Sequence, residues 1–200
     1  MGARRIETGC LYGPTGQRKY LDADERRRFI AAANAAPPRD RALCLTLAYT
    51  GARVSEVLAL TAATLHAMEG FITIRSLKKR KALKFRDVPV PFPLFGAIET
   101  GSAFDAGQPD KRLWPITRSR AWQIVKRIMR EAGIGPGLHA SPKGLRHAFG
   151  INAVRSGVPL SLVQRWLGHA SMATTAIYLD VMGPDEREIA ARMWGSSPLR

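Results

Sequence analysis

The sequence is poor in cysteine and in acidic residues, and it has no long apolar run. Its two cysteines, Cys10 and Cys44, are too few for a disulfide framework and lack metal-ligand spacing, so we expect reduced thiols. No stretch approaches the ~18 apolar residues of a membrane-spanning helix. The first residues also lack the apolar core of a signal peptide. These absences predict a cytosolic protein that has no membrane partner.

Motifs for metal and nucleotide chemistry are absent as well. The sequence contains no H-E-x-x-H, no C-x-x-C and no Walker-type loop. Nuclease mechanisms driven by a metal or a nucleotide would therefore lack their ligands. We expect neither a metal nor a cofactor.

Basic side chains are abundant. Thirty-one lysines and arginines against 16 acidic residues give a formal net charge of +15. Such an excess repels itself in a compact chain unless a polyanion is the usual partner, which favours nucleic acid. A basic protein that is merely soluble stays the alternative on composition alone. With 200 residues and 46% apolar content, the chain is long enough for a core of its own.

Caps, prolines and glycines divide the chain into short elements. The expected helices cover about 22–34, 38–51, 53–60, 117–133, 141–157, 159–168 and 171–179. Two β-branched segments, 70–77 and 85–90, predict strands joined by the basic turn KKRKALK. In the helix over 117–133, an apolar stripe that includes Trp122 and Met129 is expected in the core. The fold class is therefore mainly α with a small antiparallel β-hairpin.

The segment from His139 to Tyr178 carries polar residues at fixed helical intervals. Ser141 and Pro142 start a helix, which places Arg146 on its second turn. A following helix ends at Gly168 and leaves His169 at its terminus, nine residues before Tyr178. This spacing indicates a reaction centre.

These residues carry a family resemblance. K-x-x-R-H (Lys143 to His147), L-G-H (Leu167 to His169) and Tyr178 resemble the catalytic boxes of the tyrosine recombinase, or phage integrase, family. Upstream, TGARVSEVLAL resembles that family's first arginine box, with Arg53 as the arginine. The resemblance covers about residues 20–195 and implies the tyrosine recombinase catalytic-domain fold.

The resemblance implies a site-specific recombinase that cuts and rejoins DNA without metal through a 3′-phosphotyrosyl intermediate. Tyr178 is then the nucleophile, and Arg53 and Arg146 suit the phosphate because each guanidinium can donate two parallel hydrogen bonds. Lys143 and His169 complete the donor set, although the family more often has histidine at the Lys143 position. We interpret His147 mainly as a structural hydrogen-bonding residue.

The family also keeps one catalytic lysine on such a hairpin, where it acts as general acid toward the leaving 5′ oxygen. Counting eight residues from Gly70 selects Lys78, whereas counting eight back from Pro89 selects Lys81. Because a length change belongs in the turn, counting from the near strand is preferred, and we assign Lys78.

Composition and the same resemblance together set the expected domain boundaries and partners. We expect a flexible basic arm over 1–19, a catalytic domain over 20–195 and a tail over 196–200, in a single-domain form that lacks the family's N-terminal core-binding domain. The expected partners are double-stranded DNA, further copies of this chain that exchange the helix 184–194, and an accessory protein. The alternative for that helix is packing on its own domain. The expected location is the bacterial cytoplasm, on nucleoid or plasmid DNA.

Basic side chains outside the catalytic set are candidates for DNA contacts. They are Lys79, Arg80, Lys81, Lys84, Arg118, Arg120, Lys126 and Arg127. Two other functions stay open. A strand-relaxing enzyme of the type IB topoisomerase kind would act as a monomer on any duplex. A DNA-binding regulator with a recombinase fold would have lost catalytic residues, whereas all six positions are filled here.

Overall fold

A computed structural model of the chain describes residues 11–76 and 84–181. The elements are α1 (Ala23–Ala35), α2 (Pro38–Thr50), α3 (Val54–Val57), η1 (Ala62–Thr64), β1 (Leu65–His66), β2 (Phe71–Ser76), β3 (Lys84–Pro89), α4 (Pro93–Gly101), α5 (Arg118–Glu131), α6 (Pro142–Arg155), α7 (Leu160–Leu167), α8 (Ala173–Ala176) and η2 (Leu179–Val181).

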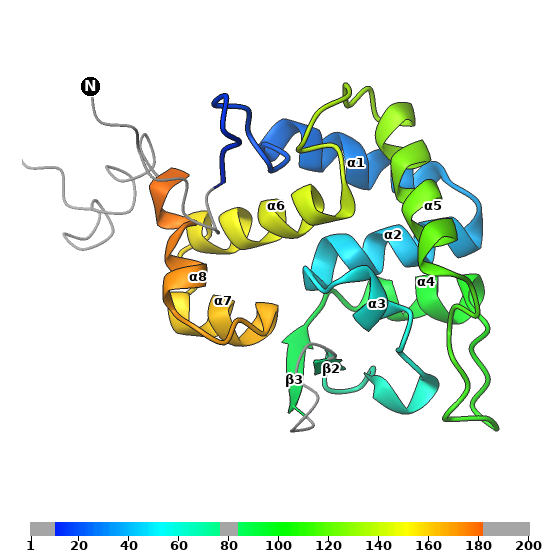
Figure 1. The fold of residues 1–200 in the computed structure, drawn as a ribbon. Helices are drawn as coiled ribbons and strands as arrows, with labels where there is room; N and C mark the ends of the chain where they lie inside the picture. The colour runs from blue at the N-terminus through cyan, green and yellow to red at the C-terminus, as the bar shows by residue number, and fades with distance from the viewer. Residues whose placement is uncertain (1–10, 77–83, 182–200) are drawn as a thin grey trace, which may run out of the picture.

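The described part is mostly helical, with one small antiparallel sheet in the order β1-β2-β3 (Figure 1). The sheet lies at one end of the molecule, where α3 contacts β2 and α7 contacts β3. The predicted hairpin is β2 paired with β3, in the register that sets Ile74 opposite Arg86. The fold class expected from the sequence is confirmed. The two-residue strand β1 was not expected.

Local sequence signals account for the helix ends. Asp22 caps α1 in a capping box with Glu25, as expected for an acidic residue before a helix. Helix α2 begins at Pro38 and ends at Gly51, which has φ +60°. A Cβ at Gly51 would lie 2.5 Å from the ring of Phe149 on α6. This glycine therefore lets the end of α2 approach α6 closely.

Helix α2 is the centre of the core. Leu43, Cys44 and Ala48 are fully buried in it, and the helix contacts α1, α4 and α6. A Cβ at Gly101 would lie 2.1 Å from the carbonyl oxygen of Pro38, so α4 also needs a glycine to pack against α2. The residues that immediately follow α2 are thus held by a rigid support.

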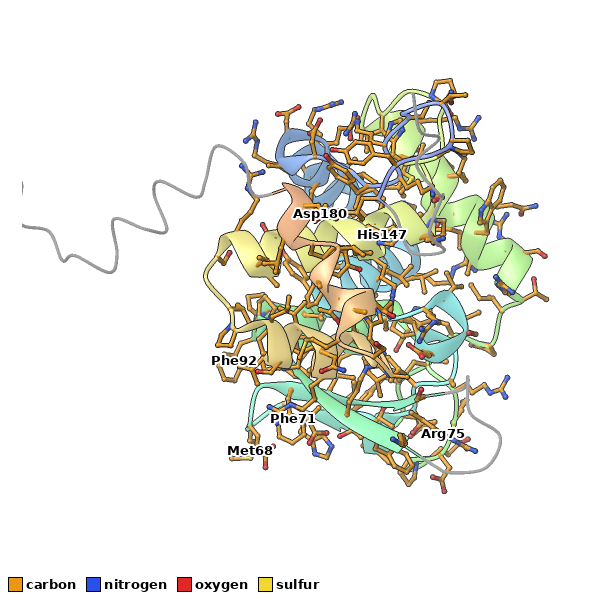
Figure 2. All side chains as sticks on the ribbon, turned by 60° about the vertical axis from the view of Figure 1, so that its left-hand side comes forward. Met68, Phe71, Arg75, Phe92, His147 and Asp180 are labelled. Atoms are coloured by element: carbon orange, nitrogen blue, oxygen red, sulfur yellow. The ribbon has the colours of Figure 1, made fainter. Side chains whose placement is uncertain are left out.

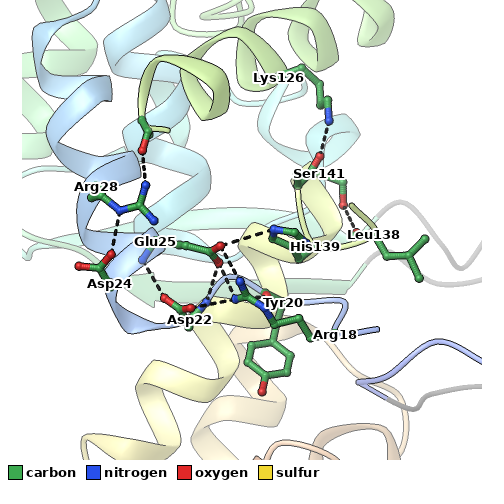
Figure 3. A network of polar contacts seen from close by, with 12 residues as sticks. Arg18, Tyr20, Asp22, Asp24, Glu25, Arg28, Lys126, Leu138, His139 and Ser141 are labelled. Atoms are coloured by element: carbon green, nitrogen blue, oxygen red, sulfur yellow. Dashed lines mark hydrogen bonds and ion pairs between the residues drawn. The ribbon is translucent and has the colours of Figure 1, made fainter. Parts of the chain in front are cut away.

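Residues 11–21 pack against the helices, which differs from the loose arm expected over 1–19. Leu11 and Leu21 are both only 2% exposed. The Arg18 guanidinium donates two hydrogen bonds of 2.6 Å to the carboxylate of Glu25 in α1. This bidentate pair, visible in Figure 3, ties the segment to the domain. Residues 1–10 lie outside the described residues.

The same polar network supports the connector between α5 and α6 (Figure 3). Arg28 of α1 donates to the carbonyl of Ala132 at 2.5 Å. Lys126 of α5 donates from Nζ to the carbonyl of Ala140 at 2.7 Å. His139 Nε2 lies 3.5 Å from Glu25 Oε1. These contacts fix the connector just before the helix that carries the K-x-x-R-H residues.

The packing of α5 differs from the expected stripe in one residue. Val125 and Met129 are buried as expected, but Trp122 is 49% exposed, and Lys126 Nζ lies 5.8 Å from its ring centroid. The buried face is shifted by one position along the helix and uses Ala121 and Ile128 instead. Within residues 11–76 and 84–181, no helix is both long and apolar enough to cross a membrane.

Candidate active site

The start of α6 is built to hold Arg146 in the interior. Ser141 caps the helix by accepting a hydrogen bond of 3.1 Å from the backbone N–H of Gly144. Gly144 is required here because a Cβ would lie 1.8 Å from the carbonyl oxygen of His139. Arg146 then falls on the second turn, as predicted, and is only 8% exposed.

The Arg146 guanidinium joins the ends of two helices. Nη1 donates to the carbonyl of Gly51 at 2.8 Å, and Nη2 donates to the carbonyl of Leu167 at 2.6 Å. Burial, together with the nearby positive charge of Arg53, lowers the pKa of Arg146 to about 10, so it stays protonated at neutral pH. Since an arginine has five N–H donors, these two bonds leave donors for a ligand.

Arg53 is the N-cap residue of α3 and is placed directly after the end of α2. Its Nη1 donates to Glu56 Oε1 at 2.8 Å, and its backbone N–H donates to Glu56 Oε2 at 3.0 Å. The side chain is 33% exposed while that of Glu56 is fully buried. The carboxylate therefore orients a guanidinium whose outer edge stays accessible.

Glu56 has a second partner in Arg86 of β3, whose Nη2 donates to Glu56 Oε2 at 2.6 Å. Burial alone would raise the pKa of Glu56. The charge and hydrogen bond of Arg86, together with those of Arg53, hold this pKa below its ordinary value instead. The carboxylate is thus ionised and shared between two arginines.

His169 follows the left-handed Gly168 at the end of α7. Its Nδ1 lies 3.0 Å from the hydroxyl of Thr175, which is fully buried. Burial lowers the pKa of His169 to about 3, assisted by the charges of Arg146 and Arg53. A neutral imidazole with one nitrogen held by a hydroxyl is left with the other nitrogen for a phosphate oxygen.

Tyr178 packs against α6 and is only 1% exposed. A Cβ at Gly150 would lie 2.5 Å from Cε2 and Cζ of the tyrosine, so the ring occupies the space that this glycine leaves. The hydroxyl lies 3.2 Å from His147 Nδ1, and the ring stacks beside His169 with centroids 6.2 Å apart. Tyr178 lies two residues beyond the end of α8, whereas the sequence predicted it within a helix over 171–179.

Burial sets the protonation states of Tyr178 and His147. It raises the pKa of Tyr178 to about 12. It also lowers the pKa of His147 to about 4, with the charges of Lys143 and Arg146 contributing in the same direction. At neutral pH a neutral phenol therefore faces a neutral imidazole. His147 lies on α6 and is labelled in Figure 2, and its Nδ1 is 3.2 Å from the hydroxyl of the predicted nucleophile. Its mainly structural hydrogen-bonding role stays a prediction.

An open cleft of about 380 Å³ lies between the sheet and α7. Arg53, Lys84, Arg86 and His169 are among its lining residues. Lys143 is exposed in the first turn of α6. Lys78 falls within 77–83, outside the described residues, so its predicted role stays a prediction. Among all residues that the structure describes, no group of three or more His, Cys, Asp or Glu side chains could hold a metal ion.

A sequence model described as the Phage integrase family matches residues 19–183. The chain belongs to the phage integrase family. Among its relatives, the tyrosine recombinase XerA of Pyrococcus furiosus is 31% identical over an alignment of 181 positions, which covers 87% of this chain and 61% of XerA. The tyrosine recombinase XerD of Neisseria meningitidis serogroup B is 36% identical over an alignment of 168 positions, which covers 77% of this chain and 55% of XerD.

Solved structures of phage integrase family members have the same fold. The crystal structure of XerA recombinase matches with a TM-score of 0.68 at 28% identity, over 89% of this chain and 66% of that chain. The catalytic domain of bacteriophage HP1 integrase matches with a TM-score of 0.63 at 22% identity, over 90% of this chain and 98% of that chain, a likeness of fold. The predicted catalytic-domain fold is confirmed.

The DNA-contact candidates of this phage integrase family member differ in their surroundings. Arg118 and Arg120 are exposed in the first turn of α5, and Lys84 is exposed at the start of β3. Lys126 donates within the protein as described above, and Arg127 pairs with Asp40 and Glu131. Lys79, Arg80 and Lys81 lie outside the described residues.

Sequence reasoning missed two residues of the site. Thr175 was passed over because a threonine in a short helix carries no signal of its own. Arg86 could have been found from the alternation of its strand. In β3 the inward positions are Arg86 and Val88, and the neighbouring outward positions are exposed. A charged residue on the inward-facing side of a strand, where apolar residues are expected, indicates a buried partner of opposite charge. That partner here is Glu56.

Proposed function

We propose that this chain is a site-specific DNA recombinase that cuts and rejoins double-stranded DNA through a 3′-phosphotyrosyl intermediate. The observation that carries the proposal is the convergence of Arg53, Arg146, His169 and Tyr178 from four separate segments. They lie close enough that the charges of both arginines act on the pKa values of His169 and Tyr178. The chain spans 61% of XerA and 55% of XerD, both of which are named as tyrosine recombinases.

The reaction needs one nucleophile, several cationic donors and one acid. The Tyr178 oxygen attacks the scissile phosphorus, the P–O5′ bond breaks, and the DNA strand becomes joined to the tyrosine through its 3′ phosphate. Arg53 and Arg146 donate to the non-bridging oxygens, where charge accumulates in the transition state. The phenolic proton leaves to a base, and the described partner of the hydroxyl is His147.

The leaving 5′ oxygen takes a proton from the ammonium group of Lys78 in this proposal, since a lysine ammonium gives up a proton far more readily than an arginine guanidinium does. Attack of a second 5′ hydroxyl on the phosphotyrosine reverses the steps and joins new strands. Because the phosphotyrosine conserves the bond energy, rejoining needs no nucleotide. Assembly of several copies through 184–194, and an accessory protein, belong to the same proposal; 184–194 lies outside the described residues.

The test is capture of the covalent intermediate. Duplexes tiled across the DNA that flanks the gene, each with one nick, are incubated with the protein in excess EDTA and resolved under denaturing conditions. The wild type should form an adduct on a subset of duplexes, and Tyr178→Phe should form none while binding them equally. Tyr49→Phe, on α2, is the matched control. An adduct with Tyr178→Phe would overturn the nucleophile assignment, and no adduct with wild type on any duplex would overturn the function.

A supercoiled plasmid that carries the reactive duplex then separates recombination from strand relaxation. A recombinase should yield joined products only when paired sites are present, with a rate that rises steeply with protein concentration. Relaxation of plasmids that lack the site, at a rate proportional to protein, would favour the topoisomerase alternative.

A further inference from the structure

Arg86 is a buried arginine for which the catalytic scheme above has no task. It lies on β3, is 7% exposed, and uses its guanidinium to contact elements that are far apart in the sequence. Nη2 donates to Glu56 Oε2 at 2.6 Å, and Nε donates to the carbonyl of Trp166 at 2.7 Å. One side chain therefore joins the sheet, α3 and the end of α7.

The contact with Trp166 acts on the residue that follows the helix. The last two carbonyls of α7 are held by two arginines, Trp166 by Arg86 and Leu167 by Arg146. Cations at a helix C-terminus stabilise its partial negative charge. Gly168 comes next, and a Cβ there would lie 3.1 Å from Arg86 Nη1. The backbone turn that presents His169 is thus packed directly on the Arg86 guanidinium.

The contact with Glu56 acts on the first arginine box. Glu56 Oε2 accepts from Arg86 and from the backbone of Arg53, and Oε1 accepts from the Arg53 guanidinium. If Arg86 were absent, a buried carboxylate would have Arg53 as its only cationic partner among these groups. The carboxylate of Glu56 would then neutralise the Arg53 charge, which would be less available to a phosphate.

We propose that Arg86 is a positioning residue for the strand-transfer reaction. It offsets the charge of Glu56, so that Arg53, although paired with that carboxylate, keeps positive charge to offer the phosphate. It also fixes the end of α7, so that His169 meets the same phosphate. This rests on the proposed function. It assigns to β3 a role in the site that is separate from any lysine of the neighbouring hairpin turn.

The decisive variant is Arg86→Lys, which keeps one positive charge but cannot reach Glu56 and the Trp166 carbonyl with a planar fork. Arg86→Gln is the harsher variant. Arg75→Gln is the matched control, because Arg75 is exposed on the paired strand β2 and lies well apart from His147 in Figure 2. Cleavage is measured in single turnover on the nicked duplex that the wild type attacks, beside duplex affinity and thermal unfolding.

Arg86→Lys should stay folded, bind the duplex as the wild type does, and cleave at least roughly tenfold more slowly, the lower range for a misplaced transition-state donor. The defect should shrink on a duplex whose scissile phosphate carries a methyl group in place of one non-bridging oxygen, because that linkage has lost the charge that Arg53 offsets. Arg75→Gln should behave as wild type. Wild-type cleavage by folded Arg86→Lys, or an equal loss of affinity and cleavage, would overturn the proposal.

A DNA-free measurement keeps the inference independent of the reaction. In the ¹⁵N spectrum of the folded protein, the Arg53 side-chain signal and the His169 ring signals should shift and broaden in Arg86→Lys and stay unchanged in Arg75→Gln. Unmoved signals would refute the positioning role even if cleavage fell. A wild type that forms no adduct on any duplex would refute the proposed function, and these signals would still decide what Arg86 does.

Discussion

The two arginines of the candidate site contribute differently to the fold. Arg146 is buried and satisfies the carbonyls of Gly51 and Leu167, whereas Arg53 is one-third exposed and pairs with a carboxylate that Arg86 also holds. Removing Arg146 leaves two buried carbonyls unpaired, which costs about 1–3 kcal/mol each. Removing Arg53 leaves Glu56 with its other partner. Equal importance for catalysis therefore does not mean equal importance for stability.

We predict that Arg53→Ala and Arg146→Ala each slow cleavage by more than roughly a hundredfold, as expected when a transition-state donor is lost. Only Arg146→Ala should also lower the denaturation midpoint clearly. Single-turnover cleavage and urea unfolding of both variants measure the two effects. Loss of DNA affinity alone, with normal cleavage at saturation, would make either arginine a simple DNA contact.

A second residue-scale prediction concerns Gly150. A methyl group there would meet the Tyr178 ring at 2.5 Å, so Gly150→Ala should lift the ring from α6 and expose it. Because burial raises the pKa of Tyr178 to about 12, exposure should return it toward about 10. Ring-labelled tyrosine, titrated by NMR and assigned with Tyr178→Phe, measures this. Gly96→Ala on α4 is the control, since its Cβ would meet nothing within 4 Å. An unshifted Tyr178 titration in Gly150→Ala would show that α6 yields instead of the ring.

At the scale of elements, α5 combines side chains that support the fold with side chains that are free at the surface. Arg127 pairs with Asp40, which is buried, and Lys126 holds the connector before α6. Arg118 and Arg120 are exposed beyond the N-cap Thr117. The four candidate DNA contacts on α5 therefore fall into two pairs. Lys126 and Arg127 bond within the protein, whereas Arg118 and Arg120 are exposed.

We predict that Arg118→Ala and Arg120→Ala each weaken duplex binding uniformly and reduce the salt dependence of log K by about one unit, as for a lost phosphate contact. Arg127→Ala should instead lower stability, because Asp40 loses a partner. Binding titrations across salt concentrations and thermal unfolding of the same variants separate the effects. The assignment fails if Arg127→Ala lowers the salt slope and leaves stability unchanged.

Most elements could be predicted because their signals are local. Helix ends are marked through caps and backbone geometry by Asp22, Pro38, Gly51, Ser141 and Gly168. The observed ends lie within one or two residues of those positions. The catalytic boxes were found through the family resemblance, and the structure brings four of those residues together.

The missed features depend on contacts between distant segments. The exposure of Trp122 depends on which neighbours α5 meets, and the partners of Arg86 lie 30 and 80 positions away in the chain. The docking of Tyr178 on Gly150 and His147 likewise joins residues that no local pattern relates. Sequence periodicity says which face of an element is apolar, but it does not say what packs there.

At the scale of the whole molecule, two partly buried histidines make stability depend on pH. The pKa values of His147 and His169 are lowered by burial to about 4 and about 3 in the folded state, against about 6.5 when unfolded. The unfolded chain therefore binds more protons as pH falls below 6.5, so stability is full above that value and is lost toward pH 4.

Between pH 7 and pH 5 this should cost at most about 2 kcal/mol for each histidine. Urea unfolding at both values measures it. His147→Gln should lose less stability over this interval than the wild type, because one of the two groups with a lowered pKa is removed. Identical losses for His147→Gln and wild type would contradict the assignment.

The positive charge of the whole chain predicts how it holds DNA. With a net charge of +15, affinity for a duplex should come mostly from phosphate contacts that release counterions, so it should fall steeply between about 50 and 200 mM salt. We expect residues 1–10, which include Arg4 and Arg5, to add to this affinity.

Packing of Leu11 and the Arg18 pair with Glu25 determine where a truncation can stop. A chain that begins at residue 11 should keep the wild-type unfolding midpoint and bind more weakly at both salt concentrations. A chain that begins at residue 20 should also unfold earlier, since it loses that packing. Affinity that survives both the higher salt and removal of 1–10 would show that the remaining surface binds DNA by itself, against this prediction.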